Sequence, residues 1–572
     1  MIIGYLIHFI RSFLIILANL IKRRIKAPDY VQFTLHGSYP DLKEPPKGFL
    51  QSKIQPREKS LQELEKEFQL IAKSQQVKGI ILHLGNLNLP FSRIQSLTRM
   101  IENLQDSGKE VITWAKNYDT RSYFLATAAD RIMLQEGGVV YTLGFANRQL
   151  YMKNALDWCG IEFDVVKVSP YKSALEMFTR SNMSEEVREM INWLMDSIYE
   201  QFVGAVGRGR NLKEEQVKAL MDKTPLYGEK AVQEKAIDKV INAEDLPAFL
   251  GSQEKAARVA TWDECGKIFP RPLPPFPGRY IAVLRVQGNI VDGKSQRPPA
   301  PPPFPIPFLF NEQTGDLSFV QQARQVLRDK RIKGVLLYID SGGGSAAASE
   351  AITSALQKIA AKKPVVAMLG SIAGSGGYYV ATPASHVVAQ PATITGSIGV
   401  ITARLVNSRL LEKLLLNRES IERGQKDLFE STDAPFTEEE REKVWEFVNQ
   451  IYELFLKRVA ESRNKNAQEV DEVGRGKVWT GEQALSHGLV DELGGLQTAL
   501  SKLRSLANLP PNTGLVEIPL PKQDSSPVPV AGGMVKYALD NLSHLQKEQA
   551  MMAGPLYFHN PLEPGSTNGN NS

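Results

Sequence analysis

An internal repeat restricts the fold of this chain more than any other feature of its sequence. Residues 77–84 read Val-Lys-Gly-Ile-Ile-Leu-His-Leu, and residues 332–339 read Ile-Lys-Gly-Val-Leu-Leu-Tyr-Ile, at an offset of 255. Further pairs of segments keep this offset or one shortened to 253: 122–127 with 377–382, 141–144 with 396–399, and 227–231 with 480–484. Because a register kept over about 150 residues does not arise by chance, the sequence predicts a tandem duplication of a domain of about 190 residues.

The two copies show the pattern of an α/β fold. The 572 residues are too many for one hydrophobic core, since a domain usually holds about 100–200 residues. In each copy short apolar strands alternate with helical segments, such as the expected helices over 346–360 and 438–462. This alternation is typical of buried parallel strands that are covered by helices.

The repeat also predicts how the chain is divided. We expect the first copy over 50–250 and the second over 278–510. Residues 251–310 hold two proline clusters, which predict a linker and a proline-rich insertion on either side of a strand at 280–286. Residues 521–572 are polar towards their end, which predicts a disordered tail.

A serine between two glycines follows an apolar strand in the second copy. Ser375 comes shortly after the expected strand 365–369, and a glycine-rich loop, 341–345, follows the strand before it. This arrangement predicts an exposed nucleophile beside backbone N–H groups that hold an oxyanion, although glycine clusters also serve as plain turns. In the first copy Thr120 replaces the serine and Leu-Asn-Leu replaces the three glycines. Any serine chemistry therefore belongs to the second copy.

A serine nucleophile needs a base, and the histidines are poorly placed for this role. His386 lies 11 residues after the serine, about three turns along an expected helix, while His83 and His487 fit packing or surface positions. Lysine is the other option, because a buried amine can be neutral and accept a proton. Lys172 and Lys426 occupy equivalent places in the two copies, and both stay candidates on this argument.

Composition argues against a nucleic-acid partner, and also against a disulfide framework or a zinc site. The 68 basic and 63 acidic residues leave a net charge of +5, and the basic residues lack the interleaved aromatics of a strand-binding groove. We therefore expect no nucleic-acid partner. Cys159 and Cys265 are too few for a disulfide framework and lack the spacing of a zinc site, so we expect packed thiols.

The first 26 residues differ from the rest of the chain. Residues 2–21 are mostly apolar and long enough to span a bilayer. On a helix their polar members fall along one stripe: His8, Arg11, Ser12 and Asn19. A spanning anchor and an interfacial amphipathic helix are therefore both open, and either would place residues 1–26 in membrane lipid. The basic segment 22–26 favours a cytoplasmic body by the positive-inside tendency.

Five short segments are specific in combination: 340–345 (Asp-Ser-Gly-Gly-Gly-Ser), 374–379 (Gly-Ser-Gly-Gly-Tyr-Tyr), 395–399 (Thr-Gly-Ser-Ile-Gly), 171–174 (Tyr-Lys-Ser-Ala) and 478–481 (Val-Trp-Thr-Gly). Together they resemble the signal peptide peptidase A family, also called protease IV, in its long tandem-domain form. The resemblance covers about residues 60–510. It implies an α/β chain of two tandem Clp-protease/crotonase-like domains, built of ββα spiral repeats and preceded by an N-terminal membrane-associated helix.

The resemblance also implies the chemistry of the site. It implies a serine endopeptidase that degrades cleaved signal peptides and other apolar peptides with a Ser/Lys dyad. Lys172 from the first copy matches the base, and Ser375 from the second matches the nucleophile. Ser397 matches a serine that orients the lysine, and the N–H groups of Gly344 and Gly376 match the oxyanion hole. No metal, nucleotide or organic cofactor is implied, and the sequence shows no Walker-type loop.

The family's assembly and location are further expectations. The resemblance implies a homotetramer held at the cell (inner) membrane by a single N-terminal anchor, with its catalytic body outside the cytoplasm. The basic segment 22–26 conflicts with that last point.

The sequence departs from the family pattern at two positions. Gly342 stands where the family usually has proline, which makes that loop more flexible. Lys426 lies 51 residues after the serine, where single-domain members carry their base, but Asp427 beside it favours the charged form. Lys172 is therefore the preferred base and Lys426 the alternative. Two other functions stay open: a catalytically silent peptide-binding membrane scaffold, and a crotonase-like acyl-thioester enzyme that needs no serine.

Overall fold

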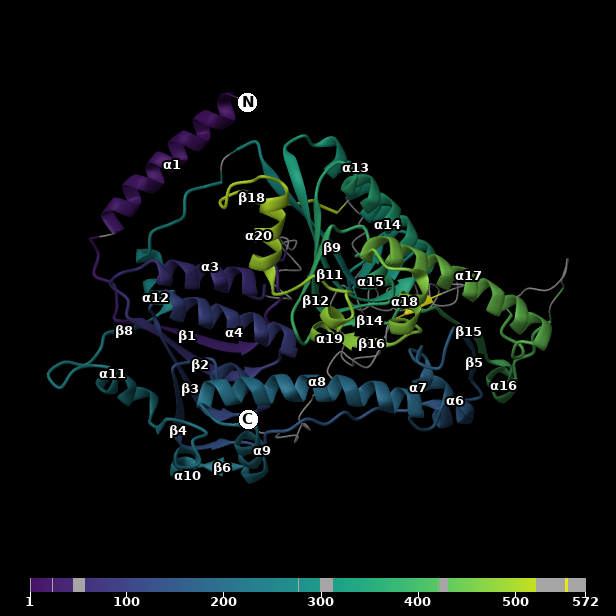
Figure 1. Cartoon of the computed structure of the whole chain (residues 1–572), viewed down its shortest axis with the longest axis horizontal. Helices are drawn as coiled ribbons and strands as arrows, with labels where there is room; N and C mark the ends of the chain where they lie inside the picture. Colours follow the sequence, from purple (N-terminus) through teal and green to yellow (C-terminus); the bar gives the residue numbers. More distant parts are fainter. Residues whose placement is uncertain are drawn as a thin grey trace.

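Two α/β units lie side by side along the long axis of the molecule (Figure 1). The computed structural model describes residues 2–22, 24–44, 57–275, 277–298, 312–419, 421, 431–520 and 551–553. Each unit is built on its own sheet, which is mainly parallel and flanked by helices. The predicted tandem α/β fold is therefore confirmed.

The sheet of the first unit has the strand order β6-β4-β3-β2-β1-β8, and β7 pairs with β4. Its strands are β1 (Tyr30–Gly37), β2 (Gly79–Leu87), β3 (Glu110–Tyr118), β4 (Arg131–Val140), β6 (Leu226–Tyr227), β7 (Lys239–Val240) and β8 (Val259–Thr261). The central strands are parallel, with registers such as Val31↔Ile80 and Ile80↔Val111. Consecutive residues of β2, including Ile81 and Leu82, are buried because helices and loops cover both faces of the sheet.

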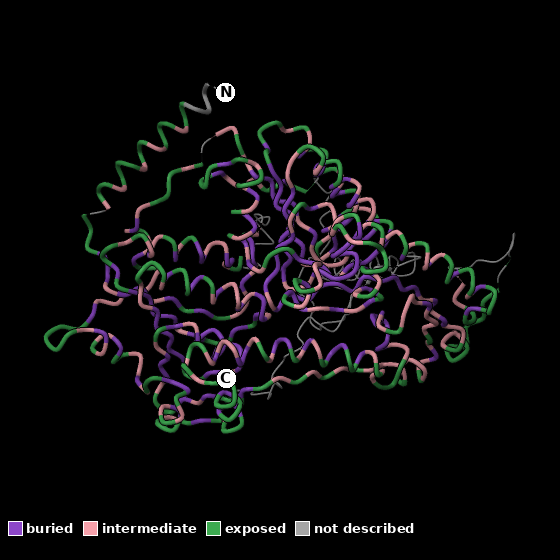
Figure 2. The backbone as a smooth tube through the Cα atoms, in the orientation of Figure 1, coloured by how far each residue is buried: buried purple, intermediate pink, exposed green. Residues whose placement is uncertain are grey.

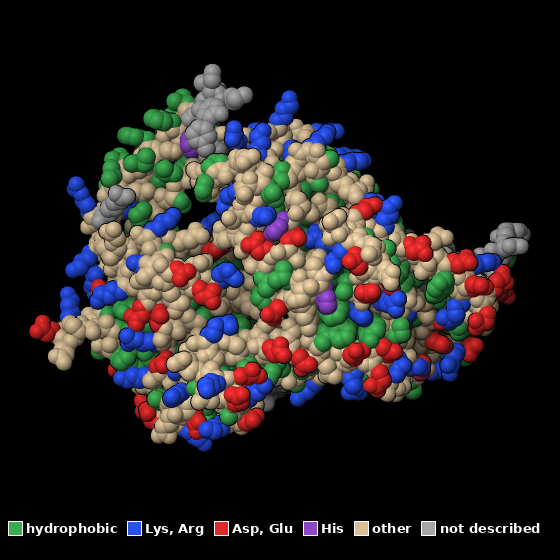
Figure 3. All heavy atoms as spheres, in the orientation of Figure 1, with side chains coloured by type: hydrophobic (Ala, Val, Ile, Leu, Met, Phe, Trp, Pro, Cys, Tyr) green, Lys and Arg blue, Asp and Glu red, His purple; other side chains and the backbone are tan. Residues whose placement is uncertain are grey.

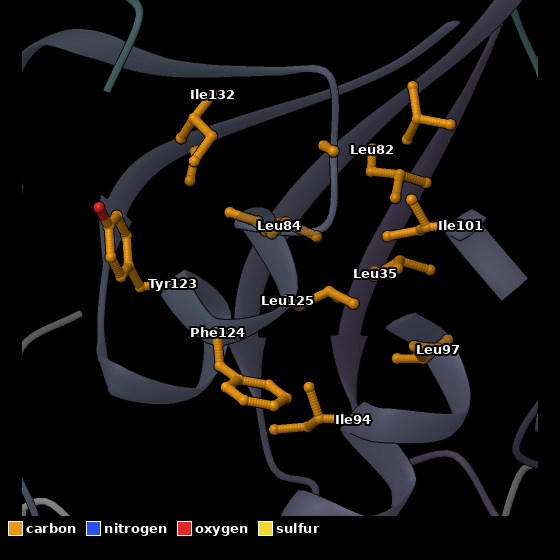
Figure 4. Close-up of a cluster of buried hydrophobic side chains, with 14 of the residues drawn as sticks. Leu35, Leu82, Leu84, Ile94, Leu97, Ile101, Tyr123, Phe124, Leu125 and Ile132 are labelled. Atoms are coloured by element: carbon orange, nitrogen blue, oxygen red, sulfur yellow. The ribbon is translucent and has the colours of Figure 1, made fainter. Parts of the chain in front are cut away.

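Helices of the first unit pack their apolar faces on this sheet. They include α3 (Leu61–Ala72), α4 (Phe91–Asp106), α5 (Thr120–Ala126), α8 (Glu185–Arg210), α9 (Glu214–Lys223) and α10 (Gly228–Gln233). In the core, Leu97 of α4 and Leu125 of α5 lie against Leu35 of β1 and Leu82 of β2 (Figure 4). Each of these side chains is at most 2% exposed, and burying one stabilises the fold by about 1.5–3 kcal/mol.

The sheet of the second unit repeats this plan and has more strands. Its main path is β16-β14-β12-β11-β19-β15-β5, and β9 also pairs with β11. The strands are β9 (Tyr280–Val291), β10 (Gln313–Gly315), β11 (Ile332–Ser345), β12 (Val365–Gly374), β13 (His386–Ala389), β14 (Ile394–Gly396), β15 (Ile401–Val406), β16 (Val478–Thr480), β17 (Glu492–Leu493), β18 (Gly514–Glu517) and β19 (Met551–Ala553). The last strand of the path, β5 (Glu162–Lys167), comes from the first copy of the sequence and pairs antiparallel with β15.

The helices of the second unit follow the predicted repeat. They include α13 (Asp316–Arg328), α14 (Ala346–Ala360), α15 (Gly376–Tyr379), α17 (Glu438–Arg463), α18 (Ala467–Val473), α19 (Gly481–Ser486) and α20 (Leu496–Leu506). α8 and α17 both have 26 residues, and their C-caps, Asn211 and Asn464, both adopt the left-handed conformation. Asparagine tolerates this conformation, so both helices end in the same way.

The first unit differs from its expected boundaries at both ends. It begins with β1 at Tyr30 rather than at residue 50, because Val31, Phe33 and Leu35 of this strand enter the core. At the other end β8, which lies in the expected linker, pairs with β1. Sequence patterns missed β8 because three residues are too few to show a period.

The expected insertion and tail fall mostly outside the described residues. This holds for 299–311 in the insertion and for 521–550 and 554–572 in the tail. Within the tail, however, β19 forms a strand against β11 rather than the disorder expected there.

The N-terminal helix α1 (Ile2–Lys22) stands apart from both units (Figure 1). His8, Ser12 and Asn19 of its polar stripe are half-buried, whereas the large apolar side chains of residues 6–21 are exposed, apart from Ile15, and lie open in Figure 3. Figure 2 shows this helix exposed along most of its length, whereas the strands of the two sheets are buried. Among the described residues, no helix is both long enough and apolar enough to cross a bilayer.

Candidate active site

Ser375 lies at a sharp turn between β12 and α15. Its backbone has φ 54° and ψ −120°, a left-handed φ that costs a non-glycine residue about 1–3 kcal/mol. Its N–H donates a hydrogen bond of 2.8 Å to the carbonyl of Gly396 on the neighbouring β14, which holds the turn in place. The side chain is fully buried. A strand-to-helix turn of this kind presents a serine hydroxyl at the carboxyl end of a parallel sheet.

Lys172 from the first copy reaches this serine. Its Nζ lies 2.8 Å from Ser375 Oγ, 2.8 Å from the carbonyl oxygen of Ser397 and 3.0 Å from Ser397 Oγ. The side chain is only 1% exposed. The pairing of β5 with β15 explains this reach, because β5 ends at Lys167, five residues before the lysine, on the edge of the second sheet.

Burial controls the charge of this amine. Burial lowers the pKa of Lys172 well below its usual value, because the charged form loses its hydration. A neutral amine has two N–H groups and one lone pair. The two N–H groups match the two oxygens of Ser397 as acceptors, and the lone pair is left to accept the proton of the Ser375 hydroxyl.

Ser397 is itself held in an unusual conformation. Its φ is 52°, and its N–H donates a hydrogen bond of 2.7 Å to the carbonyl of Lys477. The same loop packs against the lysine, because a Cβ added at Gly476 would lie 2.6 Å from Lys172 Cα. Gly476 was not among the residues predicted for the site, and the sequence marks it only by a Gly-Arg-Gly run before the Val-Trp-Thr-Gly segment.

The glycine-rich loop at the end of β11 meets the serine turn. A Cβ added at Gly376 would lie 3.3 Å from the nitrogen of Gly344, so the backbones of these two residues are adjacent. Gly344 has φ 154°, and a Cβ there would lie 2.0 Å from the carbonyl oxygen of Ile290. Glycine is therefore required at 344. At Gly342, where the family usually has proline, an added Cβ meets no atom within 4 Å.

Asp340, just before this loop, ties the two active-site strands together. Its Oδ1 accepts hydrogen bonds of 3.1 Å from the N–H groups of Ser371 and Ile372 on β12. Its Oδ2 lies 2.8 Å from a guanidinium nitrogen of Arg93, which belongs to α4 of the first unit. Arg93 also binds Asp41 at 2.9 Å, so a charged network of the first unit supports the site of the second.

The equivalent position in the first unit has lost these features. Thr120 begins α5, where Asp119 is an ordinary N-cap that accepts a hydrogen bond of 2.7 Å from the N–H of Ser122. The Thr120 hydroxyl lies 3.3 Å from the backbone of Gly144. This geometry fits the prediction that serine chemistry belongs to the second copy.

The histidines considered as bases have other partners. His386 begins β13 rather than extending a helix, because α15 ends at Tyr379, and its Nε2 lies 2.9 Å from Glu492. His83 is on β2 of the first unit, where burial lowers its pKa to about 4. His487 is the C-cap of α19 and packs on Trp479.

Lys426 and the two cysteines are the remaining candidate residues. Lys426, the alternative base, lies outside the described residues. Cys265 is buried, as expected for a packed thiol, whereas Cys159 is only half-buried, and both are free.

Comparison with known proteins identifies the family. A model of peptidase family S49 matches residues 103–257 and 357–510, which together exceed half of the chain. The chain belongs to this family. The S49 protein is 29% identical over 516 residues to "Serine protease SPPA, chloroplastic" of Arabidopsis thaliana, an alignment that covers 87% of this chain and 75% of the relative. It is 30% identical over 459 residues to "Protease 4" of Haemophilus influenzae, with 76% and 70% covered.

A shorter alignment gives a higher identity. Over 232 residues the S49 protein is 36% identical to "Putative signal peptide peptidase SppA" of Enterococcus faecium, which covers 40% of this chain and 63% of the relative. The family predicted from the sequence is confirmed, and the protein is a serine protease with two S49 domains. The comparisons favour this function over the silent scaffold and the acyl-thioester enzyme.

Proposed function

We propose that this S49 protease cleaves apolar peptides with a dyad of Ser375 and Lys172. Ser375 Oγ attacks the peptide carbonyl while Lys172 Nζ takes the hydroxyl proton and then passes it to the leaving amine. The N–H groups of Gly344 and Gly376 stabilise the oxyanion. Water, deprotonated by the same amine, then hydrolyses the acyl-enzyme. The observation that carries the proposal is the 2.8 Å separation of Nζ and Oγ in a fully buried site.

Signal peptides released after their cleavage are the proposed substrates. The name of the Enterococcus faecium relative supports this class. A dry site with a neutral base also suits apolar chains, since a charged side chain would lose its hydration there.

We also propose that residues 1–26 bind the protein to the surface of the cell (inner) membrane. The support is the apolar surface of α1, on which Phe9 is 69% exposed and Ile21 63%. Clusters of exposed apolar residues of this kind are typical of membrane or protein contacts.

The assembly and the detailed fold are proposals on the family resemblance. We propose a homotetramer, and the exposed apolar tip formed by Trp158 and Leu415, 79% and 89% exposed, supports a contact between copies.

We further propose that each unit has the Clp-protease/crotonase-like fold. The support is the recurrence of parallel strands with a short helix at the position of the serine in both units.

Substitution of the two dyad residues tests the chemistry. We expect Ser375→Ala and Lys172→Ala each to lower kcat for a fluorogenic apolar peptide at least about 1,000-fold. Thr120→Ala, at the equivalent position of the first unit, is the matched control and keeps full activity. Lys426→Ala keeps most of it. Full activity of Lys172→Ala, or loss of activity only in Lys426→Ala, would overturn the assignment of the base.

A further inference from the structure

Beside the nucleophile, the edges of β11 and β15 are separated by the width of one strand, and we call this gap the groove. β12 pairs with β11 only as far as Ser341↔Ala373 and ends one residue before Ser375. From Gly343 onward, that edge of β11 no longer faces β12. On the far side of the groove β15 begins at Ile401 and is backed by β5, the strand that leads to Lys172. Two strand edges therefore face each other next to the dyad.

A segment from the C-terminal part of the chain fills this groove. β19 pairs antiparallel with β11, in the register Gly343↔Ala553, Gly344↔Met552 and Ser345↔Met551. It also pairs antiparallel with β15 through Ile401↔Met551. It thus joins β11 to β15 in the sheet, and its middle residue lies opposite Gly344.

We propose that residues 551–553 occupy the peptide-binding groove as an internal pseudo-substrate. The inference rests on the active site proposed above, in which Gly344 is one of the two residues assigned to the oxyanion hole. Strand addition recognises a peptide mainly through its main chain, so the groove accepts any segment that can be extended there. The segment 550–554 reads Ala-Met-Met-Ala-Gly and is uncharged, like the apolar substrates proposed for the enzyme.

The chain that connects Leu520 to residues 551–553 acts as a tether, so this segment can compete with external peptides for the groove. Thirty residues separate Leu520 from Met551. At about 3.3–3.6 Å per residue this chain can span up to about 100 Å. A tethered ligand has an effective concentration of the order of 1 mM, so a segment with a dissociation constant of about 0.1–1 mM competes with external peptides. Such competition raises KM and leaves kcat unchanged.

A proline in the strand tests the proposal in the full-length protein. Met552→Pro removes the N–H of the central residue, and proline does not fit inside a sheet. We expect KM for the fluorogenic peptide to fall about two- to tenfold with kcat unchanged. Asn568→Pro, a proline in the same tail but beyond the strand, is the matched control and keeps the wild-type KM. A synthetic peptide of residues 548–556 should inhibit Met552→Pro competitively.

Hydrogen exchange provides a readout that does not depend on catalysis. In Ser375→Ala, the amides of 551–553 should exchange more slowly than those of the synthetic peptide, and Met552→Pro in the same background should remove this protection. Equal KM values for Met552→Pro and the wild type, with unprotected amides, would overturn the pseudo-substrate. If no variant cleaves any peptide, the dyad fails. Protected amides would then still support occupancy of the groove, and unprotected amides would overturn it.

Discussion

At the scale of single residues, the site holds two groups in states that are unfavourable on their own. Ser375 has a left-handed backbone, and Lys172 is an amine removed almost completely from water. Ser397 and the surrounding loops supply what both need, namely hydrogen-bond partners for the amine and a tight turn for the serine. Strain and burial of this kind are typical of functional sites.

Replacing the lysine by an apolar residue should stabilise the protein while removing its activity. In the wild type Lys172 takes up a proton on unfolding, because its pKa is lowered well below 10.5 in the folded state. Between these two pKa values the free energy of unfolding rises with pH by about 1.4 kcal/mol per unit. We expect Lys172→Met to lack this slope. Its advantage over the wild type, measured by chemical unfolding, should therefore shrink as the pH rises toward 10.5, and a constant difference would contradict a neutral buried lysine.

Two glycines of the same loop should respond differently to one added methyl group. Gly344→Ala brings a Cβ to 2.0 Å from the Ile290 carbonyl at φ 154°, which displaces the N–H assigned to the oxyanion hole. We expect kcat to fall about 100-fold or more, as when one oxyanion donor is lost. Gly342→Ala places its Cβ in open space and should keep activity within about twofold. Equal losses in the two variants would show that the loop as a whole, not the position of one N–H group, limits catalysis.

At the scale of elements, α1 differs from every helix of the two units. Asn19 exchanges hydrogen bonds of 2.9 and 2.8 Å with the backbone of Arg271, and Lys22 donates one of 3.0 Å to the carbonyl of Phe269. The C-terminal end of the polar stripe therefore contacts residues 269–271, and the apolar face is exposed. This orientation fits an interfacial helix that lies on a membrane while staying attached to the enzyme.

Charges on the apolar face of α1 should weaken membrane binding. Phe13 and Leu17, 58% and 49% exposed, lie one turn apart on that face. Burying each in lipid contributes about 1.5–3 kcal/mol, so Phe13→Glu with Leu17→Glu should lower the partition coefficient into anionic vesicles at least about tenfold. Co-sedimentation measures the effect, and peptide cleavage should not change. Leu317→Glu, at a leucine of α13 that is 60% exposed, is the control. Equal binding of both variants would argue against α1 as the membrane contact.

At the scale of the whole molecule, the first unit has Thr120 at the position of Ser375 but contributes residues to the site of the second unit. It supplies Lys172 through the β5 arm, and its helix α8 packs on β16, where Trp193 donates a hydrogen bond of 2.8 Å to Val478 and stacks on Trp479. Arg93 adds an ionic link to Asp340. The first unit therefore packs against the candidate active site of the second and contributes side chains to it.

Removing the ionic link between the units should affect stability and catalysis together. Arg93→Ala leaves Asp41 and Asp340 without their shared cation in a largely buried position. Breaking such a buried pair costs about 3–5 kcal/mol, which thermal unfolding would detect. We also expect a lower kcat, because Asp340 holds the N–H groups that precede the serine turn. Arg99→Ala, on the exposed face of the same helix, should change stability by no more than about 0.5 kcal/mol. Similar effects of the two variants would contradict a specific role for Arg93.

Local patterns in the sequence were enough to predict the two units, several of their helices and the serine turn. Apolar periodicity and the repeat predicted the two α/β units, and the helices α14 and α17 appear where they were expected. Glycines around Ser375 predicted the serine turn, because steric rules for one residue and its neighbours suffice there. These features depend on residues that lie close together along the chain.

Contacts between residues that lie far apart in the sequence were seen only in the tertiary structure. From the sequence, Lys172 was the preferred base and Lys426 the alternative, but local patterns did not predict the contact itself, because Lys172 and Ser375 lie 203 positions apart. That contact depends on β5 leaving its own unit to pair with β15, and no local period predicts such a crossing. The same holds for Gly476 behind the lysine, for Arg93 beside Asp340 and for β19 in the groove. Strand pairing and packing are determined by the lowest free energy of the whole chain, so these contacts follow from the complete fold.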